Sequence, residues 1–504
     1  MKLSAAMALR FYNTLSQQVE PFSPLRDGTV RIYTCGPTVY DYAHIGNFRT
    51  FTFVDILRRW LRLSGYALNH VMNITDVDDK IIRNATAQRK SLAEYTAVYT
   101  EAFWEDCARL RLETPEHRVA ATSHIDDMVD AIQRLSQGNH TYKSDGSIYF
   151  RIASFPGYGK LSHSNFSGNI AGARVDVDSY EKADARDFAL WKTPKEGEPF
   201  WETALGPGRP GWHIECSAMA IKYLGETLDI HAGGVDLIFP HHENEIAQSE
   251  ALTGKPFSRF WLHSEFLLVE GQKMSKSLGN YYTLRDILEK HGFEPEAVRY
   301  LLASVPHRKQ LNFTFDGLKS AVTAIDRLRN FKLRLDTDRF DEGIDERAAA
   351  RTAQACKAFR DGMDDDLNTA EALGAVFEYI RDTNSAMDSG EFREGNVKGA
   401  LELLEWFDKV FDVLNPTVAA ETEISDEEVE ARIGERTAAK KARDFALADQ
   451  IRAQLLERGI ILEDTKAGIR WKRTVNRGAA SPAQHTLGSG PSATSKERSP
   501  GGAK

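Results

Sequence analysis

The sequence predicts an α/β fold: a Rossmann-like parallel-sheet domain with an inserted connective region, followed by a helical bundle and a small C-terminal α+β unit. Two strand-like apolar runs, at residues 30–33 and 68–74, flank a segment with helical periodicity at 53–61. The order strand, helix, strand is typical of a parallel sheet. From residue 283 to about 415, apolar residues recur at helical spacing in one segment after another, which predicts a bundle.

The first predicted strand runs through a turn containing Gly36 and Gly46 into the first predicted helix, which Ser64 and Gly65 end. A turn between a strand and a helix places backbone N–H groups and the positive helix end beside its ligand, an arrangement suited to phosphate. A nucleotide is therefore the expected ligand at this turn.

The second predicted strand ends at Thr75 and Asp76, followed by Asp78 and Asp79. Ligands of parallel sheets lie beyond the carboxyl ends of the strands, so we expect Thr75 and Asp76 near the site. The carboxylates of these aspartates could bind Mg²⁺ or act as general acids and bases. For Asp78 and Asp79, capping of the next helix is an equally good interpretation.

The later segments complete the expected organisation. Residues 92–137 read as helical, 138–210 are rich in Gly, Ser and Asp, and the last residues are rich in Gly, Ser, Pro and Ala. The expected parts are residues 11–137 and 211–282 as two halves of a catalytic domain, 138–210 as a connective insertion, 283–415 as a helical bundle, 424–475 as a small basic unit and 478–504 as a disordered tail.

Composition limits the class of protein. At 504 residues, two to four domains are expected from typical sizes of roughly 100–200 residues. No apolar run approaches the ~20 residues that span a bilayer. The four cysteines lack the spacing typical of disulfide pairs, which favours a reducing compartment, so we expect a cytoplasmic protein. No feature of the sequence requires an oligomer, so we expect a monomer. With a net charge of −9, any RNA contact must depend on local basic surface.

Two short motifs point to one enzyme class. His44-Ile45-Gly46-Asn47 stands at the first turn, and Lys273-Met274-Ser275-Lys276-Ser277 lies between Gly271 and Gly279. They resemble the His-Ile-Gly-His and Lys-Met-Ser-Lys-Ser elements of class I aminoacyl-tRNA synthetases. Alone, His44 reads as a helix cap, but two unrelated matches in the expected order are specific.

Four potential metal ligands are scattered along the chain. Cys35 follows the first strand, Cys216 lies on a later segment, and His241 and Glu245 are four apart on one predicted helix. Singly, each reads as a buried small residue or a helix cap. Together, two thiolates, an imidazole and a carboxylate suit Zn²⁺. By spacing alone, His242 competes with His241 for the imidazole position.

Longer segments narrow the resemblance to one family. The segments at 35–41, 73–76, 211–219 and 239–245 resemble cysteinyl-tRNA synthetases, and the similarity runs from about residue 11 to residue 473. The resemblance implies that Cys35, Cys216, His241 and Glu245 hold one zinc ion, and it favours His241 over His242. It also implies that Thr75 and Trp212 line the amino-acid pocket with Cys35, and that Lys276 contacts ATP.

The implied reaction joins L-cysteine to tRNA(Cys) in two steps through an adenylate, with ATP and its Mg²⁺. The residues expected around ATP are His44, Gly46, Asn47, Gly233, Gly234, Asp236, Lys273 and Lys276; His44, Asn47, Lys273 and Lys276 are the expected catalytic groups. Asn47 departs from the frequent histidine, and an amide can donate a hydrogen bond but carries no charge. Since zinc binds thiolate selectively, no editing domain is expected.

The predicted C-terminal unit has a positive net charge, opposite in sign to the net charge of the whole chain. Residues 432–473 contain eleven Lys or Arg and six Asp or Glu, which predicts tRNA binding. The expected contacts are Lys440, Lys441, Arg470, Trp471, Lys472 and Arg473. Trp471 offers a ring on which a base can stack; alternatively, it fills a small core.

Two other functions remain possible on the sequence. A cysteine:glucosaminyl-inositol ligase resembles the same core, zinc included, but lacks an anticodon-binding part. In this chain, about 190 residues of predicted helical bundle and basic terminal unit, from 283 to 473, follow the Lys273 loop, which favours tRNA. A non-catalytic tRNA- or nucleotide-binding paralogue would be expected to lose its motif residues, yet His44, Lys273 and Lys276 are present.

Overall fold

The computed structural model describes residues 8–26, 28–164, 186–416, 425–458, 460–465 and 468–473. It contains two compact units, Met1–Thr417 and Val418–Lys504, which we describe separately. The tail expected at 478–504 lies outside the described residues. Among the described residues, no helix is both long and apolar enough to cross a membrane.

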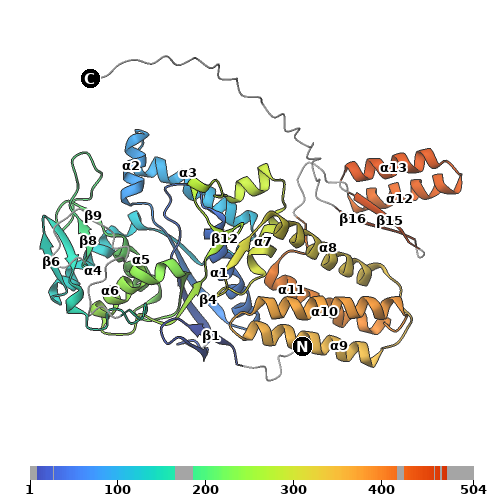
Figure 1. The fold of residues 1–504 in the computed structure, drawn as a ribbon, viewed down its shortest axis with the longest axis horizontal. Coiled ribbons are helices and arrows are strands. Elements are labelled where there is room, and N and C mark those ends of the chain that lie inside the picture. The colour runs from blue at the N-terminus through green and yellow to red at the C-terminus, as the bar shows by residue number, and fades with distance from the viewer. Residues whose placement is uncertain are drawn as a thin grey trace, which may run out of the picture. The chain divides into compact units, whose positions relative to one another are not determined.

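A five-stranded parallel sheet forms the centre of the first unit (Figure 1). Its order is β11 (Ser258–Ser264), β10 (Leu228–Gly234), β3 (Thr29–Thr34), β4 (Ala67–Ile74) and β5 (His117–Ala120). All four pairings are parallel, which confirms the predicted α/β fold. β5 lies within residues 92–137, expected to be wholly helical. That expectation was wrong because four residues between two helices carry too little periodicity to reveal a strand.

Helices cover both faces of this sheet. Ile32 of β3 belongs to the hydrophobic cluster that includes α1 (Ile45–Leu63), while its neighbour Tyr33 belongs to the cluster of α4, α5 and α6. This division follows from strand geometry, since successive side chains point to opposite faces. The bounds are α2 (Asp79–Ala87), α3 (Leu92–Arg109), η1 (Ala121–His124), α4 (Ile125–Gln137), α5 (Trp212–Leu224), η3 (Val235–Leu237), η4 (Ile238–His242) and α6 (Glu243–Thr253).

The chain leaves β3 in one direction along the sheet and later returns to its other side. β4 follows β3 through α1, whereas β10 pairs with the opposite edge of β3. The carboxyl ends of β3 and β10 therefore form a topological switch point, where open α/β sheets bind their ligands. Asp78 caps α2 by accepting a hydrogen bond from the backbone N–H of Ile81 at 2.7 Å, as the capping interpretation predicts.

The insertion folds as a four-stranded antiparallel sheet. Its strands are β6 (Thr141–Ser144), β7 (Ser147–Phe150), β8 (Phe188–Lys192) and β9 (Arg209–Pro210), with η2 at Ile152–Ser154. The remaining short elements are β1 (Arg10–Asn13), β2 (Gln18–Pro21), β12 (Leu267–Val269), β13 (Gln272–Lys273), η5 (Lys276–Leu278), η6 (Asp286–Lys290) and β14 (Leu311–Phe313). β14 interrupts a region predicted to be helical throughout, and it pairs with β12 beside the Lys273 loop.

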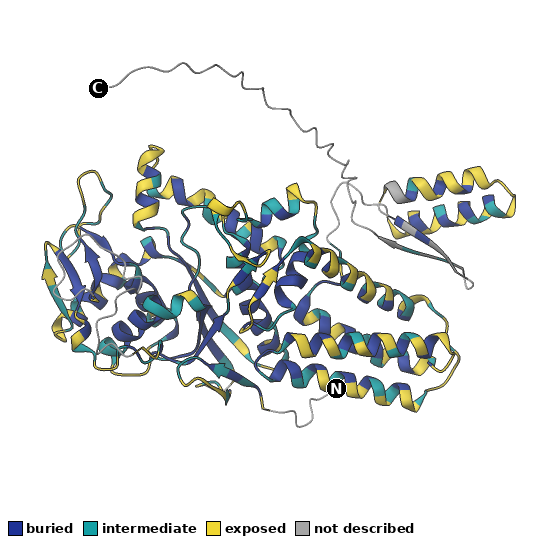
Figure 2. Cartoon of the chain, viewed as in Figure 1, coloured by how far each residue is buried: buried dark blue, intermediate teal, exposed yellow. Residues whose placement is uncertain are grey.

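The helices α8 to α11 lie side by side as a bundle (Figure 1). The bounds are α7 (Pro295–Ala303), α8 (Phe315–Thr337), α9 (Glu346–Asp364), α10 (Thr369–Asp388) and α11 (Glu394–Phe411). Leu318, Ile325 and Leu328, which recur at helical spacing along α8, are buried, and the outer faces of the helices are exposed (Figure 2). The hydrophobic cluster of the bundle is continuous with the face of the sheet that α1 covers.

The second unit is the predicted small α+β fold. It contains α12 (Asp426–Lys441), α13 (Phe445–Glu457) and a hairpin of β15 (Ile460–Thr465) and β16 (Gly468–Arg473). Ser425 caps α12 by accepting from the Glu428 N–H at 3.2 Å. A core of aliphatic side chains, including Val429, Ile451 and Leu455, holds the helices on the hairpin.

Candidate active site and metal centre

Four separate elements bring the predicted metal ligands to the switch point. Cys35 directly follows β3, Cys216 lies on α5, His241 lies in the turn that precedes α6, and Glu245 lies in the first turn of α6. None of the four side chains is more than 8% exposed. Residues up to 210 positions apart in the sequence thus share one buried cluster.

The donor atoms of this cluster have the spacing of a tetrahedral metal site. Cys35 Sγ lies 3.7 Å from Cys216 Sγ, 3.4 Å from His241 Nε2 and 3.5 Å from Glu245 Oε1, and His241 Nε2 lies 3.0 Å from Glu245 Oε1. For zinc–ligand bonds of about 2.0–2.3 Å, the edges of a tetrahedron are roughly 3.3–3.8 Å. The three distances from Cys35 lie in this range, and the His241–Glu245 distance is slightly shorter. The residues present therefore fit a zinc ion.

His242 also reaches the cluster. Its Nε2 lies 3.5 Å from Cys35 Sγ and 4.0 Å from Glu245 Oε1, so Cys35, His231, His242 and Glu245 form a second possible ligand group. Only the group with His241 contains both thiols, and thiolates favour zinc over harder cations. Nδ1 of His242 forms a hydrogen bond of 2.8 Å with Nε2 of His263.

Several outer partners of the cluster were missed in the sequence. His231 Nε2 lies 2.9 Å from Glu245 Oε2, and His213 Nδ1 lies 2.9 Å from His241 Nδ1. Such contacts fix the orientation of ligating groups. In the sequence, His231 is a histidine within a predicted strand, and His213 stands three residues before Cys216. Neither pattern distinguishes an outer partner from an ordinary buried histidine.

The cluster places acidic groups around a cationic imidazole. Burial raises the pKa of the Cys35 thiol well above its usual range. Burial lowers the pKa of His241, but Glu245 and Cys216 raise it to about 10. Burial raises the pKa of Cys216, but a hydrogen bond from Cys35 and the charge of His241 bring it down to about 6. Burial also raises the pKa of Glu245, yet His231 and His241 lower it to about 2. A thiolate and a carboxylate held this way match the donor set of a divalent cation.

The residues expected to line the amino-acid pocket adjoin the cluster. The indole of Trp212 stacks on the His241 ring, with centroids 4.2 Å apart. The Thr75 hydroxyl donates to Glu215 Oε2 at 3.1 Å and accepts from Asn73 Nδ2 at 3.2 Å. Glu215 is fully buried, which raises the pKa of its carboxyl group well above the usual range, and it was missed because its single carboxylate has no distinctive spacing.

His44 and Asn47 form a reciprocal capping box at the start of α1. His44 Nδ1 accepts from the Asn47 N–H at 3.2 Å, and Asn47 Oδ1 accepts from the His44 N–H at 3.1 Å. The cap interpretation of His44 is thus confirmed. Burial lowers the pKa of His44 to about 4, so its imidazole is neutral near pH 7. Because Nδ1 accepts, the ring proton resides on Nε2, which can donate to a phosphate oxygen.

The loop with Lys273 and Lys276 folds back on this helix end. The N–H of Ile45 donates to the carbonyl of Tyr282 at 3.0 Å, and a Cβ on Gly46 would lie 3.1 Å from Met274 Cε. Lys276 Nζ is paired with Asp41 Oδ2 at 2.5 Å. Gly271 and Gly279 bracket the loop with φ of +74° and +68°, values that favour glycine.

The remaining predicted nucleotide residues lie at the end of β10. A Cβ on Gly233 would come within 2.8 Å of His242 Cε1, and one on Gly234 would collide with the Asp236 carboxylate. A Cβ at position 233 would thus press on a buried ring, whereas one at position 234 would displace the Asp236 carboxylate. The structure thus gathers the predicted ATP-side residues and the metal cluster at adjoining strand ends.

Comparison with known proteins identifies the family. The family described as "tRNA synthetases class I (C) catalytic domain" matches residues 21–323, and the "DALR domain" matches residues 358–415. The cysteine–tRNA ligase of Solibacter usitatus is 75% identical, over 93% of this chain and 100% of its own length. That of Koribacter versatilis is 56% identical, over 93% and 100%. The chain belongs to the cysteine–tRNA ligase family.

Solved structures share the fold of this cysteine–tRNA ligase family member at low sequence identity. Methionyl-tRNA synthetase from Mycobacterium tuberculosis, in complex with methionyl-adenylate, matches with a TM-score of 0.60 and 16% identity, over 76% of this chain and 92% of its own. A leucyl-tRNA synthetase complex from Agrobacterium radiobacter matches with a TM-score of 0.58 and 11% identity, over 78% and 85%. The likeness supports the class I fold.

The basic residues of the second unit are only partly described. Lys440 and Lys441 end α12. Trp471 of β16 packs against the unit's core, as the alternative interpretation predicts, and its Nε1 donates to Glu430 Oε1 at 2.6 Å. The side chains of Arg470, Lys472 and Arg473 lie outside the described residues.

Proposed function

We propose that this protein joins L-cysteine to tRNA(Cys) at the expense of ATP and selects cysteine through a zinc ion. Cys35, Cys216, His241 and Glu245 would hold the ion. The observation that carries the proposal is the tetrahedral spacing of their donor atoms next to a helix N-terminus and a lysine-containing loop. Relatives named cysteine–tRNA ligase support it.

The zinc ion addresses a recognition problem that apolar pockets solve poorly. A pocket separates substrates that differ by one methyl or hydroxyl group by roughly 10- to 200-fold. When bound, zinc supplies a Lewis-acidic centre that a thiolate ligates and that serine or alanine cannot engage equally. Trp212, stacked on His241, and Thr75, fixed by Glu215, would then shape the space around the rest of the amino acid.

In the first step, a carboxylate oxygen of cysteine attacks the α-phosphorus of ATP, and pyrophosphate leaves with the electron pair of the broken bond. The N-terminus of α1 favours the phosphates electrostatically. His44 donates from Nε2, and Asn47 donates from Nδ2 because its Oδ1 is already bonded to the His44 N–H. Mg²⁺ would accompany the ATP.

Lys276 must change partner for this step. Its ammonium group is paired with Asp41 and lies 4.9 Å from the centre of the Tyr281 ring, so it must leave Asp41 to bind a phosphate. The glycines at 271 and 279 permit that motion. Together with Lys273, it would neutralise charge on the departing pyrophosphate. Gly233, Gly234 and Asp236 would face the nucleoside, with Asp236 accepting from a ribose hydroxyl.

In the second step, a terminal ribose hydroxyl of tRNA attacks the activated carbonyl and AMP leaves. We propose that residues 283–415 and 424–475 contact the rest of the tRNA, with Lys440, Lys441, Arg470, Trp471, Lys472 and Arg473 as candidates in the basic unit. All four cysteines are free, which supports a reducing compartment such as the cytoplasm. A monomer suffices for this scheme.

The test combines three measurements on the purified protein. We expect about one zinc per chain, exchange of pyrophosphate into ATP that depends on cysteine and not on serine, and charging of bulk tRNA with cysteine. Absence of zinc would remove the proposed basis of selectivity. Exchange without tRNA charging would favour a cysteine ligase that acts on a small molecule, and absence of exchange would favour a non-catalytic binding protein.

A further inference from the structure

The corner between α9 and α10 has an uncommon backbone. Residues 364–367 read Asp-Asp-Asp-Leu, and Asp366 and Leu367 have φ of +58° and +53°. Two consecutive non-glycine residues in the left-handed region are unfavourable. Leu367 is nevertheless buried in the main hydrophobic cluster. Such a conformation persists only where surrounding contacts impose it.

The three aspartates contact three different parts of the catalytic half of the unit. Asp364 Oδ1 accepts from Trp60 Nε1 of α1 at 3.0 Å. Asp365 Oδ1 pairs with Arg10 Nη2 of β1 at 2.9 Å. Asp366 contacts both β1 and the segment after α7.

Asp366 joins the corner to β1 and to the segment after α7. Its Oδ1 accepts from the Tyr12 N–H at 2.8 Å, and its Oδ2 accepts from Arg308 Nε at 2.5 Å. The guanidinium of Arg308 also stacks on the Tyr12 ring, 4.2 Å from its centre. Asp366 itself is 8% exposed, so this carboxylate is held by charge-assisted bonds largely shielded from water.

The bundle side of the corner is equally constrained. Asn368 caps α10 by accepting from the Glu371 N–H at 3.3 Å, and a Cβ on Gly362 would lie 3.0 Å from the Ala372 backbone nitrogen. The left-handed pair lets the chain reverse between two closely packed helices while three consecutive side chains still reach the core. A second attachment exists at the end of α11, where Arg299 donates to the Phe411 carbonyl at 2.5 Å.

None of these corner contacts involves the proposed reaction centre. Trp60 lies sixteen residues beyond His44 along α1, a distance of about 24 Å at 1.5 Å per residue. The corner therefore orients the bundle on the core without touching the groups proposed to bind ATP or cysteine.

We infer that the corner at residues 364–367 is a joint that fixes the angle of the helical bundle on the catalytic core, and that it serves the tRNA-dependent step. The inference rests on the proposed function. A tRNA that engages the core and the bundle together gains from both contacts only when their geometry matches its own. Activation of cysteine needs no such match, because it uses the core alone.

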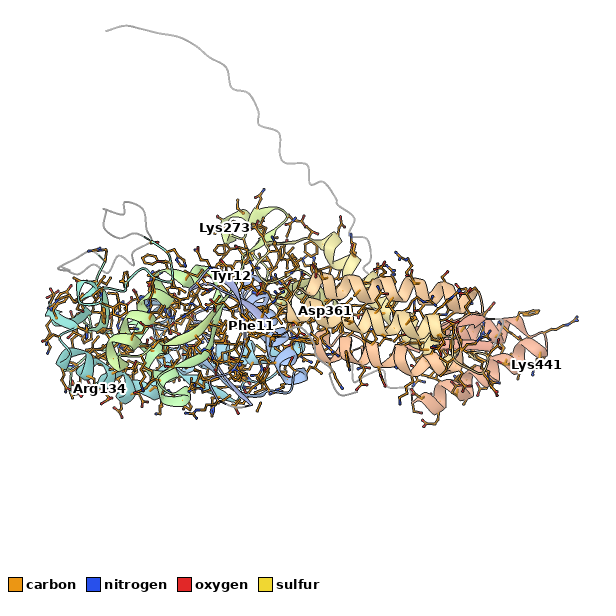
Figure 3. The ribbon with its side chains drawn as sticks, turned by 90° about the horizontal axis from the view of Figure 1, so that it is seen from below. Phe11, Tyr12, Arg134, Lys273, Asp361 and Lys441 are labelled. Carbon is orange, nitrogen blue, oxygen red and sulfur yellow. The ribbon has the colours of Figure 1, made fainter. Side chains whose placement is uncertain are left out.

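The experiment compares Asp366→Ala with Asp361→Ala. Asp361 lies on α9, before the corner, and pairs with Lys357 of the same helix, so it is an acidic control outside the joint. Figure 3 labels Asp361 on the bundle and Tyr12 in the core. We expect Asp366→Ala to keep tRNA-independent pyrophosphate exchange within about twofold and to lower kcat/KM for full-length tRNA(Cys) at least tenfold. Asp361→Ala should leave both rates unchanged.

A tRNA(Cys) with a substituted anticodon supplies the decisive readout, analysed as a double-mutant cycle. If the joint aligns the distal contacts, the anticodon substitution should cost the Asp366→Ala enzyme at least threefold less than the unmodified enzyme. Arg308→Met, which breaks the same ion pair from the core side, should reproduce the result if Asp366→Ala fails to fold. Three outcomes would overturn the inference. The first is that the Asp366→Ala and anticodon substitutions have additive effects on charging, and the second is that the unmodified enzyme does not respond to the anticodon substitution. The third is that Asp366→Ala lowers pyrophosphate exchange and tRNA charging equally. Absence of exchange in the unmodified enzyme would instead overturn the proposed function.

Discussion

The two halves of the candidate active site differ in how firmly they are held. At the metal cluster, Cys35, Cys216, His241 and Glu245 are almost entirely buried and within bonding reach of one another. At the nucleotide side, the side chain of Lys276 is 64% exposed and is held by one ion pair to Asp41. The groups proposed to select the substrate are therefore fixed in advance, whereas the lysine proposed to neutralise charge on the departing pyrophosphate can move.

The physical costs of disturbing the two halves differ accordingly. Removing one member of a buried charged cluster leaves the others without compensation in a medium of low polarity. An exposed ion pair contributes only about 0–1 kcal/mol. Substitutions in the cluster should therefore change binding of metal and cysteine, whereas substitutions at the loop should change rates and leave the metal in place.

The largest effect is expected for Cys216→Ser. Loss of a thiolate ligand should remove tightly bound zinc and reduce cysteine-dependent pyrophosphate exchange more than about a thousandfold, since changes to mere outer partners already cost roughly 10- to 100-fold. Elemental analysis and the exchange assay measure the two effects. Cys356→Ser is the control, because Cys356 lies on α9 within the bundle. Intact cysteine recognition in Cys216→Ser would contradict the role of the cluster.

Next in size is Lys276→Ala. Removing one charge that stabilises the departing pyrophosphate should slow activation about 100-fold, while the zinc content stays at that of the unmodified protein. Pre-steady-state measurement of adenylate formation gives the rate. Lys290→Ala, which changes an exposed lysine paired with Asp286, should have no effect. A loss of zinc in Lys276→Ala would show that the two halves are not independent.

His231→Ala tests the outer contacts of the cluster. Because His231 is hydrogen-bonded to Glu245 and does not belong to the ligand group that contains His241, its loss should weaken zinc affinity about 10- to 100-fold without abolishing it. Competition with a chelator measures the affinity. Affinity as weak as that of Cys216→Ser would instead make His231 a direct ligand and favour the alternative group with His242.

The pH dependence of stability tests the nucleotide side. Because burial lowers the pKa of His44 from 6.5 to about 4, folding favours the neutral ring. The contribution of His44 to stability is complete above pH 6.5 and is lost as the pH falls toward 4, by an amount on the order of 3 kcal/mol. Chemical unfolding at several pH values should show it, and His44→Asn, which retains a capping group, should lose that dependence. Parallel curves for the two proteins would contradict a neutral His44.

The smallest effect is expected for Asp41→Asn. Since an exposed ion pair contributes at most about 1 kcal/mol, its loss should change KM for ATP by no more than about fivefold. Steady-state exchange kinetics measure the change. A change of a hundredfold would mean that Asp41 contributes directly to the bound nucleotide and does not merely hold Lys276 at rest.

Local sequence determined much of this protein. The run at 30–33 and the helix after it were predictable because a buried strand and an amphipathic helix carry distinct periodicities. Gly271 marked a turn, whereas Gly46, predicted in the turn before the helix, lies in the first turn of α1. The residue types of the metal cluster were also visible, since cysteine, histidine and a carboxylate are an unusual combination. The sequence therefore determined the α/β class and the four candidate ligands.

Only the tertiary structure decided which side chains meet. His213 and His231 became partners of the cluster because α5 and β10 converge on the end of β3, and no spacing along the chain encodes that approach. The three aspartates before Leu367 likewise acquire their contacts from β1, α1 and the segment after α7. Periodicity reports each element's own buried face, whereas contacts between distant segments arise only when those faces pack together.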